Sequence, residues 1–329
     1  MRAFFLGIIR AMPFDFAAVS SPFRMQPGLR RLAPGDAQLT PNGLDDRALR
    51  EKLAVLSAHA EHALASAPGF DPAPALNALC VHARTEHPRA FGGDANTGWH
   101  ARRLGWSVHG EAVCGDGPVA IGDSLRALAP PWRLPGLLAL AFAEDFAVVD
   151  AGTGRIPWLA VCLPSSWAPE AKVGKHFTEV HAPVADNGLL LSAADHLMRL
   201  ITGAERWERF VWTISRHAAL GQHPLHGPTS TWPTSGDADA LAALAHFRTE
   251  RQTFIPVPHA AQAVFTIHVE NEPLTAAVNN PQHATQLHDA LASMSPAVLA
   301  YRGLTDVRAR LLAWLSASSA APAPPPCAP

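Results

Sequence analysis

Three histidines lie within one short stretch of the chain, residues 174–197, which reads GKHFTEVHAPVADNGLLLSAADHL. The middle one, His181, is followed by Pro183 and then by a segment with helical spacing. An imidazole can ligate a metal, haem iron included, when its direction is fixed and its other nitrogen donates to a carbonyl or carboxylate. The restricted φ of Pro183 helps to fix that direction. The spacing alone leaves a second interpretation open, in which His181 is a hydrogen-bonded histidine of a turn.

A second stretch, FRTERQTF at residues 247–254, crowds polar side chains between apolar ones. Its long polar side chains are those of Arg248, Glu250, Arg251 and Gln252. Guanidinium groups bind carboxylates, such as haem propionates, through paired hydrogen bonds, so this cluster can anchor an anion or build a polar pocket. The alternative is a solvated helix end with local ion pairs, which contribute little.

The remaining candidates carry weaker signals. The stretch ISRHAALGQHPLHGP contains His217, His223 and His226. Their spacing matches no known zinc pattern, and Pro224 and Gly227 predict a loop, so we expect surface histidines there. Glu144 and Asp145 stand at the start of a predicted strand, where a turn is favoured over a catalytic carboxylate pair.

Composition excludes several classes of protein. Charged residues make up 16% of the 329 residues, the net charge is −2, and no excess of Lys and Arg favours nucleic-acid binding. The 4 cysteines stand apart, without C-x-x-C or C-x-x-C-H, which argues against a cysteine zinc site, an iron–sulfur cluster or covalent haem in this chain. The common nucleotide-binding, hydrolase and metalloprotease motifs are missing. Isolated cysteines favour a reducing compartment, and we expect a cytoplasmic protein.

The chain is expected to contain one large domain between two short ends. An apolar run between Arg2 and Arg10 lies at the lower length limit of a signal sequence, and Met12 is an alternative start. We expect an N-terminal extension over residues 1–12, the domain over residues 13–316, and a disordered Pro/Ala-rich tail over residues 317–329. No stretch reaches the ~18 apolar residues of a membrane span.

Hydrophobic periodicity supplies the elements that must position these residues. Helices are predicted over residues 45–67, 166–177, 192–203, the start of 238–254, 280–294 and 296–317. Ser192 fits a helix cap and Gly203 a helix stop. Strands are predicted on both sides of the turn at residues 150–155, where the first arm can begin as a buried helix, and at 209–216 and 262–274. Residues 68–118 resist assignment. Hairpin-like pairing favours an antiparallel sheet, and the class is therefore α+β.

Several segments in a fixed order resemble a known family. They read PFRMQPGLRRL, EDFAVVD, VCLPSSWAPEAKVGKHFTEVHAPV, RFVWTI, FRTERQTFIPVPHAAQAVFTIHVENEPL and NPQHATQLHDALASMSPAVLAYRGL. Over roughly residues 13–316 the chain resembles the α subunit of haem-dependent oxidative N-demethylase and its relatives. The most specific pieces are PSSWAPEAKVGKHFTEVHAPV and the RTERQTF run with the AVFTIH strand that follows it.

This resemblance implies a fold and an activity. The fold is a PAS-like antiparallel sheet with flanking helices that holds non-covalent haem b. The characterised activity of the family is O2-dependent oxidation of dimethylamine to methylamine and formaldehyde. Electrons come from NADPH through separate subunits that carry FMN and a 2Fe–2S cluster, and no site for either is visible in this chain.

The family motifs carry roles over to particular residues. His181 falls on the histidine of the family's I-H-x-P-V-P run, which implies that it is the proximal haem ligand, whereas His176 stands where the family does not usually keep a histidine. The R-x-E-R-Q run falls on Arg248 to Gln252. The resemblance implies haem contacts for His181, Arg248, Arg251, Gln252, Arg209 and Trp212, and catalytic roles for Glu250, Arg251 and His268.

The chain departs from the family pattern at several of these positions. Val211 replaces an Asn, His268 replaces an Arg, Glu270 replaces a Tyr and Ala185 replaces the last Pro of the ligand motif. An arginine at the position of His268 is suited to bind a propionate or polarise bound O2; a histidine can do either less well, or ligate iron itself.

Three functions follow from these readings. The first is a haem-dependent monooxygenase that acts on a small amine or related polar substrate, with O2 and reductase subunits as partners. The second is a haem- or gas-sensing protein without turnover, in which His268 completes six-coordinate iron. The third is a haem-free subunit that serves binding or assembly. The substrate itself is not encoded in any motif.

Overall fold

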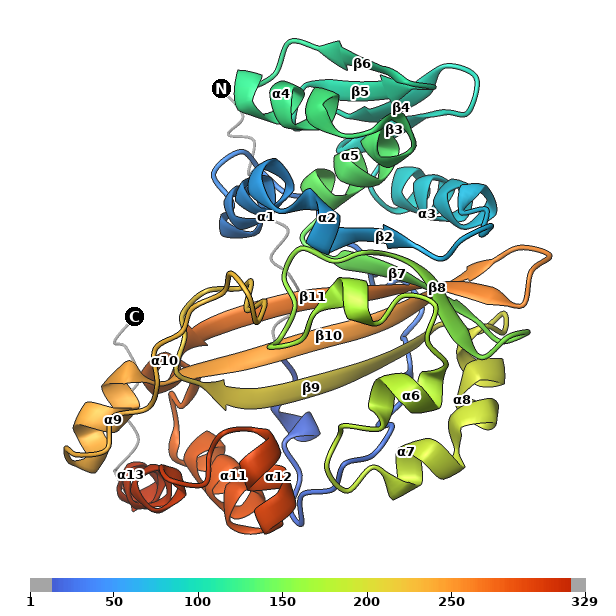
Figure 1. Ribbon diagram of the computed structural model, residues 1–329. Helices are drawn as coiled ribbons and strands as arrows, with labels where there is room; N and C mark the ends of the chain where they lie inside the picture. The colour runs from blue at the N-terminus through green and yellow to red at the C-terminus, as the bar shows by residue number, and fades with distance from the viewer. Residues whose placement is uncertain (1–13, 321–329) are drawn as a thin grey trace, which may run out of the picture.

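A seven-stranded antiparallel sheet forms the centre of the protein, for which a computed structural model describes residues 14–320 (Figure 1). Its strands follow the spatial order β1-β9-β10-β11-β7-β8-β2. In that order they span Arg30–Arg31, Trp207–Ser215, His246–Val257, Gln262–Pro273, Asp145–Asp150, Arg155–Ala160 and Leu64–Ser66. The long strands β9, β10 and β11 are neighbours, and they carry most of the polar residues singled out above.

Strand pairing divides these polar residues between the two faces of the sheet. Side chains alternate along a strand, and residues directly opposite each other on paired strands share a face. The register pairs Arg251 with both His268 and Phe210, and it pairs Gln252 with Arg209. One face, called here the Arg251 face, carries Glu208, Phe210, Trp212, Thr249, Arg251, Thr253, Thr266 and His268. The other, the Arg209 face, carries Arg209, Val211, Arg248, Glu250, Gln252 and Phe265.

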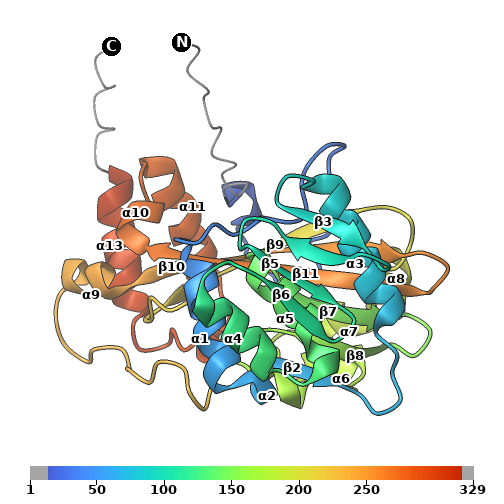
Figure 2. The same ribbon diagram turned by 90° about the horizontal axis from the view of Figure 1, so that it is seen from above.

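Different helices cover the two faces. On the Arg251 face, helices α1, α3 and α5 bury Phe146 and Val264, while α11, α12 and α13 bury Trp212 near the edge strand. On the Arg209 face, Met198 of α8 packs against Phe254 of β10. These helices span Arg47–Ala58 (α1), Ala73–Glu86 (α3), Arg133–Ala141 (α5), Ala194–Ile201 (α8), Pro281–Ala292 (α11), Pro296–Tyr301 (α12) and Arg308–Ala320 (α13). Figure 2 shows α11 and α13 at one end of β10 and β11 and α8 near the other.

The short helices connect these layers. They are η1 (Phe16–Ala18), α2 (Ala60–Ala63), α4 (Val119–Ala127), η2 (Pro130–Trp132), η3 (Pro169–Ala171), α6 (Phe177–His181), α7 (Gly188–Ser192), α9 (Ala238–Leu244) and α10 (Leu274–Ala277). Helices α6, α7 and α8 follow one another between β8 and β9, so the segment that carries His181 lies beside the sheet (Figure 1).

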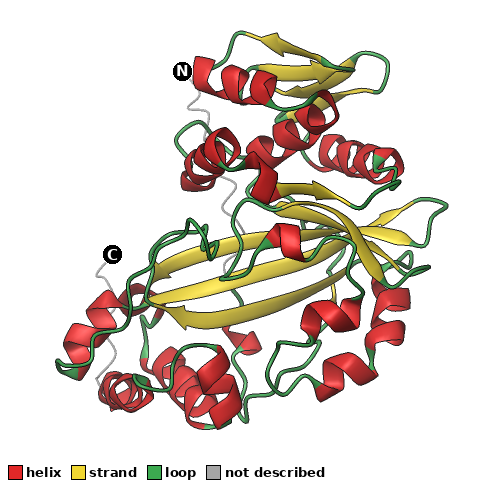
Figure 3. Cartoon of the chain, in the orientation of Figure 1, coloured by secondary structure: helices red, strands yellow, loops and turns green. Residues whose placement is uncertain are grey.

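The unassigned residues 68–118 contain α3 and a second, four-stranded antiparallel sheet (Figure 3). Its strands are β3 (Phe91–Asp94), β4 (Gly98–Ala101), β5 (Trp106–His109) and β6 (Ala112–Gly115). They are short and rich in glycine, so they show no clear alternation. Gly93 is required here, because a Cβ at this position would lie 1.9 Å from the carbonyl oxygen of Gly98 on the paired strand.

The structure confirms the α+β class with antiparallel sheets and corrects several local predictions. The turn at residues 150–155 joins β7 and β8, and the preceding apolar run is helix α5. The FRTERQTF stretch lies inside β10 and not at a helix end, since α9 already stops at Leu244. Ser192 is the last residue of α7, and Ala193 occupies the cap of α8. The Gly203 stop was placed correctly to within two residues, because α8 ends at Ile201.

The two ends of the chain are only partly covered by the structure. Helix α13 continues to Ala320, which is past residue 317 where the tail was expected to begin. The predicted extension over residues 1–12, with the alternative start at Met12, lies outside the described residues, as does the rest of the predicted tail. Among the residues that are described, no helix has the length and apolar character needed to cross a membrane.

Candidate functional site

Helix α6 is fixed at its start by His176. The ring of His176 accepts a hydrogen bond from the backbone N–H of Thr178, and the carboxylate of Glu179 accepts one from the backbone N–H of His176 at 2.7 Å. The β7–β8 turn packs closely against this cap, because a Cβ on Gly154 would come within 2.2 Å of Nε2 of His176. His176 therefore has a structural task at the beginning of the helix.

His181, the last residue of α6, is held in one orientation. Its Nδ1 lies 2.8 Å from the carbonyl oxygen of Phe177, and its ring packs against the Phe177 ring at 4.1 Å between centroids. The side-chain amide of Asn187 donates to the backbone carbonyl of His181 at 3.0 Å. Because a carbonyl can only accept, the proton is on Nδ1 and Nε2 keeps its lone pair. None of the described residues donates to that nitrogen.

Electrostatics favour the neutral form of this ring. Burial lowers the pKa of His181, and the positive charges of Arg209 and Lys172 lower it further. The neutral imidazole is the form that ligates metals. The effect of Arg209 also shows that α6 brings His181 close to the Arg209 face of the sheet.

Arg209 itself carries an unsatisfied guanidinium group. Its Nε is buried without a hydrogen-bond partner, and none of its nitrogens donates to a residue between 14 and 320. Burial lowers its pKa, although the charge of Glu250 acts in the opposite direction. A buried charged donor without a partner costs free energy unless something else satisfies it. The guanidinium group of Arg209 is therefore available to bind an anion.

Glu250 lies opposite Val211 on the same face and anchors a small polar cluster. Its carboxylate accepts hydrogen bonds from the hydroxyl of Ser165 and, at 2.6 Å, from the amide of Gln252. Tyr301, the only tyrosine, stands at the end of α12 near this carboxylate. Burial raises the pKa of Tyr301, and the negative charge of Glu250 raises it further. The carboxylate of Glu250 and the amide of Gln252 are thus hydrogen-bonded to each other, and Tyr301, which is 52% exposed, lies within range of that charge.

A pocket of about 290 Å³ opens along the edge of β9, between that strand and residues 17–30. Four arginines line it: Arg24, Arg30, Arg209 and Arg302. Burial lowers the pKa of Arg302 to about 10, and one of its nitrogens donates to the carbonyl oxygen of Trp212 at 2.6 Å. The volume is near the lower end for small-molecule pockets, and the concentration of guanidinium groups suits an anionic ligand group.

Arg248 shares this face of the sheet but is already satisfied. It is 2% exposed, and its nitrogens donate to the hydroxyl of Ser165 at 2.8 Å and to the carbonyl of Leu220 at 2.7 Å. Longer hydrogen bonds reach the carbonyls of Leu163, Pro164 and Ala219. Burial lowers its pKa to about 10. The side chain ties two loops to the sheet, and a haem contact for it stays a prediction.

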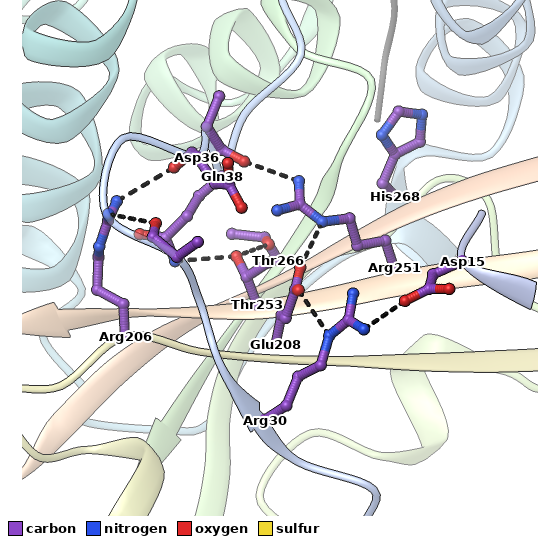
Figure 4. Close-up of polar contacts among 12 residues, drawn as sticks. Asp15, Arg30, Asp36, Gln38, Arg206, Glu208, Arg251, Thr253, Thr266 and His268 are labelled. Carbon is purple, nitrogen blue, oxygen red and sulfur yellow. Dashed lines mark hydrogen bonds and ion pairs between the residues drawn. The ribbon is translucent and has the colours of Figure 1, made fainter. Parts of the chain in front are cut away.

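Arg251 points to the opposite face, into a network of ion pairs (Figure 4). Its Nε donates to Glu208 at 2.9 Å and its Nη1 to the carbonyl of Ala37 at 2.7 Å. Glu208 also accepts from Arg30 at 2.8 Å, and Arg30 in turn contacts Asp15. The network joins the N-terminal segment to strands β9 and β10, so Arg251 has a partner of opposite charge within the protein.

His268 also faces away from His181. Its Nδ1 lies 3.1 Å from the buried carboxylate of Glu144. Burial alone would lower the pKa of His268, but the hydrogen bond and charge of Glu144 outweigh it and raise that pKa. Lys52, which is fully buried, donates to the carbonyl of Glu144 and lies 3.0 Å from Asp145. Glu144 and Asp145 thus stand at the start of β7, as predicted, and both are buried partners of cations.

Trp212 is 3% exposed and packs with α11, α12 and α13 on the Arg251 face. The structure therefore gathers His181, Arg209, Glu250 and Gln252, and places Arg251 and His268 on the opposite face of the sheet. Trp212 lines the same pocket as Arg209 and Arg302. Sequence reasoning missed Ser165, Tyr301 and Arg302. The only available signal was that a single tyrosine stands next to an arginine in a segment that resembles the family.

A comparison with protein families matches most of the chain. The family described as haem-dependent oxidative N-demethylase, alpha subunit-like, matches residues 46–312, which is most of the chain. The matched residues include α6, all of β9, β10 and β11, and Tyr301 and Arg302.

Proposed function

The chain belongs to the haem-dependent oxidative N-demethylase, alpha subunit-like family, and on that premise we propose that it is a haem b-binding oxygenase. In this proposal it carries out an O2-dependent, N-demethylation-type oxidation of a small amine or related polar substrate. Electrons reach it from a separate reductase with FMN and a 2Fe–2S cluster. The observation that carries the proposal is the oriented, neutral imidazole of His181 beside the unpartnered guanidinium of Arg209.

These two residues suit two different parts of a haem, the central iron and the propionates at its edge. An axial histidine commonly donates its other ring N–H to a carbonyl, which is the arrangement that Phe177 gives to His181. The propionates are carboxylates, and Arg209 offers a donor that no described residue uses. We therefore propose His181 as the proximal iron ligand and Arg209, with Arg302 in the same pocket, as propionate partners. Bound haem would supply the O2 chemistry that side chains cannot perform.

The polar cluster at Glu250 supports a cationic substrate. A small amine is protonated near neutral pH, so a fixed carboxylate is a suitable counter-charge for it. Ser165 and Gln252 hold the two oxygens of Glu250 and set the direction of the carboxylate. The pKa of Tyr301 is raised by burial and by the charge of the same carboxylate. We propose that Glu250 binds the ammonium group, with Gln252 and Tyr301 as positioning residues.

The order of the strands supports a PAS-like sheet. Across the sheet, five of the strands stand in the order β8-β7-β11-β10-β9. When these five are numbered by their place in the chain, the order is 2-1-5-4-3. This order supports the PAS-like sheet that we propose, and in the proposal helices α6 to α8, which follow the second of these strands, flank the ligand.

The roles suggested by the sequence for Arg251 and His268 are not part of this proposal as direct haem or substrate contacts, because these two residues face the other side of the sheet. Trp212 lines the pocket with Arg209 and Arg302, so its predicted haem contact stays in the proposal. The pairing of His268 with Glu144 also removes the feature that would have favoured a sensor with six-coordinate iron. Val211 remains the relevant departure from the family, since it lies opposite Glu250 and makes that side of the site less polar.

Haem reconstitution tests the proposal. The wild-type protein is expected to take up haem and show a Soret band, whereas His181→Ala loses it. His196→Ala is the matched control, because His196 is an exposed histidine on α8. The reconstituted protein should then consume O2 in the presence of a reductant and a small secondary amine. A featureless spectrum of the wild type, or equal haem content in His181→Ala, would contradict the haem site.

The substrate step is tested separately with Glu250→Gln. This variant should keep its haem and lose amine-dependent O2 consumption through a raised KM. A haem-loaded wild type that ignores every amine would retain the haem site but overturn the amine oxidation.

A further inference from the structure

A cluster of four histidines and one glutamate lies where the loop after β9 meets helix α2. Its members are His59, His62, Glu170, His223 and His226. His59 and His62 stand one turn apart at the junction of α1 and α2, and His223 and His226 have the same spacing in the loop. Glu170 comes from η3. Two segments that are distant in sequence therefore bring histidines together and a third adds Glu170, and none of these residues belongs to β9, β10 or β11.

The histidine rings are in contact and not merely near one another. His226 stacks on His59 at 4.0 Å and on His223 at 4.1 Å between ring centroids. The centroid of His62 lies 5.3 Å from that of His226 and 5.1 Å from that of His223. The sequence had predicted surface histidines in this loop, and for His223, which is buried, that prediction is wrong; His226 is half-buried.

The loop is folded into a defined turn that presents these rings. The backbone N–H of Gly227 donates to the carbonyl of His223 at 2.7 Å, and a Cβ on Gly227 would come within 2.5 Å of that oxygen. The backbone N–H of Gln222 donates to the carbonyl of Pro164 at 2.9 Å and fixes the loop to the neighbouring segment. Only glycine fits this turn, so the positions of the two loop histidines are built into the fold.

Hydrogen bonding separates one histidine from the other three. Nδ1 of His223 accepts from the backbone N–H of Leu225 at 3.2 Å, which leaves the proton on Nε2, and Nε2 donates to Glu170 at 3.1 Å. By contrast, Nδ1 of His62 and Nε2 of His226 are buried without any hydrogen-bond partner. Buried ring nitrogens normally have a hydrogen-bond partner or a metal ion. The two nitrogens without a partner are therefore candidates for binding a ligand.

We propose that His59, His62 and His226 bind one divalent transition-metal ion, with zinc as its representative. One ligand nitrogen from each of the three histidines lies within 4.8 Å of the others. Imidazole nitrogens suit zinc, copper and nickel, and three of them leave a fourth position for water or another group. His223, held by Glu170, stacks on His226 and fixes the orientation of its ring; it is a positioning residue.

Zinc binding to the full chain tests this site. The protein is first treated with a chelator and then titrated with zinc, with the bound metal measured by elemental analysis after gel filtration. One zinc ion per chain is expected, together with a zinc-dependent rise in Tm of the wild type. His62→Gln and His226→Gln should abolish both effects. Glu170→Gln should weaken binding by about 10-fold, at the low end of the range for outer-shell partners, because Glu170 holds the positioning residue His223 and not a ligand.

The control is His288→Gln, which alters a histidine on α11 that pairs with Asp289 and lies outside the cluster. It should bind zinc like the wild type. The Soret band after haem reconstitution should be unchanged in all of these variants, so failure of the zinc site and failure of the haem site are distinguishable. No zinc uptake by the wild type beyond that of His62→Gln would overturn the site. Loss of zinc in Glu170→Gln with full binding in His59→Gln would overturn the ligand assignment.

Discussion

The two faces of the β9-β10-β11 sheet hold similar polar residues in opposite circumstances. On the Arg251 face, Arg251 is paired with Glu208 at 2.9 Å, and His268 with Glu144 at 3.1 Å. On the Arg209 face, Arg209 makes no hydrogen bond to any described residue, and His181 keeps Nε2 available. Arg251 and His268 therefore stabilise the fold, whereas on the opposite face Arg248 is also satisfied within the protein and Arg209 is left for a ligand.

The contrast explains why charge alone is a poor guide to a binding site. Arg251 and His268 have the residue types expected of catalytic groups, yet the protein already supplies their counter-charges. A group prepared for a ligand differs in lacking a partner of its own. Substitutions on the Arg251 face should therefore change stability, and those on the Arg209 face should change ligand binding.

Glu208→Gln should have the largest effect on stability. It leaves Arg251 and Arg30 without their shared carboxylate, and breaking a buried ion pair from one side costs about 3–5 kcal/mol. Chemical denaturation measures the loss. Glu205→Gln is the matched control, because its ion pair with Arg31 is exposed and should contribute less than about 1 kcal/mol. If both variants lost a similar amount of unfolding free energy, the buried ion pairs of Glu208 would not be distinguishable from an exposed ion pair.

Arg209→Met should show the reverse pattern. Removal of an unpartnered buried charge should leave the stability of the haem-free protein unchanged or raise it. The affinity for haem should fall by about 10- to 100-fold, as for the loss of hydrogen bonds to a charged group. Arg199→Met, on the exposed surface of α8, is the control. If Arg209→Met were strongly destabilised and bound haem with unchanged affinity, Arg209 would be a residue that stabilises the fold and not one that binds haem.

The pH dependence of stability should report the His268–Glu144 pair. The pKa of His268 is raised on folding, so its contribution is fully present below about pH 6.5 and is lost as the pH rises through the folded pKa. The pKa of Glu144 is lowered in spite of burial, so its contribution is lost only on acidification below about pH 4.5.

The difference in unfolding free energy between the wild type and His268→Gln should therefore be greatest between these two pH values and shrink above pH 7. Thermal unfolding from pH 4 to pH 9 measures it, with His196→Gln as a control that should give no such profile. A difference that grows as the pH rises would contradict the pairing.

His176→Ala should have the smallest effect. Loss of the helix cap is expected to cost about 1 kcal/mol of unfolding free energy. The haem content of the folded protein should stay at the wild-type level, because the ring of His176 serves the backbone of α6. If His176→Ala lost its haem, His176 would be a ligand-binding residue and not only a helix cap.

The sequence predicted the class of the fold and singled out His181 as a candidate ligand. It did not show which polar residues lie on which face of the β9-β10-β11 sheet. Periodicity identified the β7–β8 hairpin and strand β11, since apolar residues alternate there. It failed at β10, where Arg248 to Gln252 read as a helix end because the strand is polar on both faces. It also failed at β3 to β6, where short glycine-rich strands give no period.

The faces depend on strand register, which a sequence pattern does not determine when both sides of a strand are polar. Knowing that Arg251 lies opposite His268 required the paired strands. The same holds for the histidine cluster, because His62 and His226 meet only through the packing of α2 against the loop after β9.

Imidazole rescue of His181→Gly tests the assignment of the Arg209 face most directly. This variant opens a cavity at the proximal position, and free imidazole can occupy it. We predict that the variant lacks the wild-type Soret spectrum and that added imidazole restores it, whereas His268→Gly shows the wild-type spectrum without imidazole. A wild-type spectrum in His181→Gly, or imidazole rescue confined to His268→Gly, would place the haem on the other face and contradict the account.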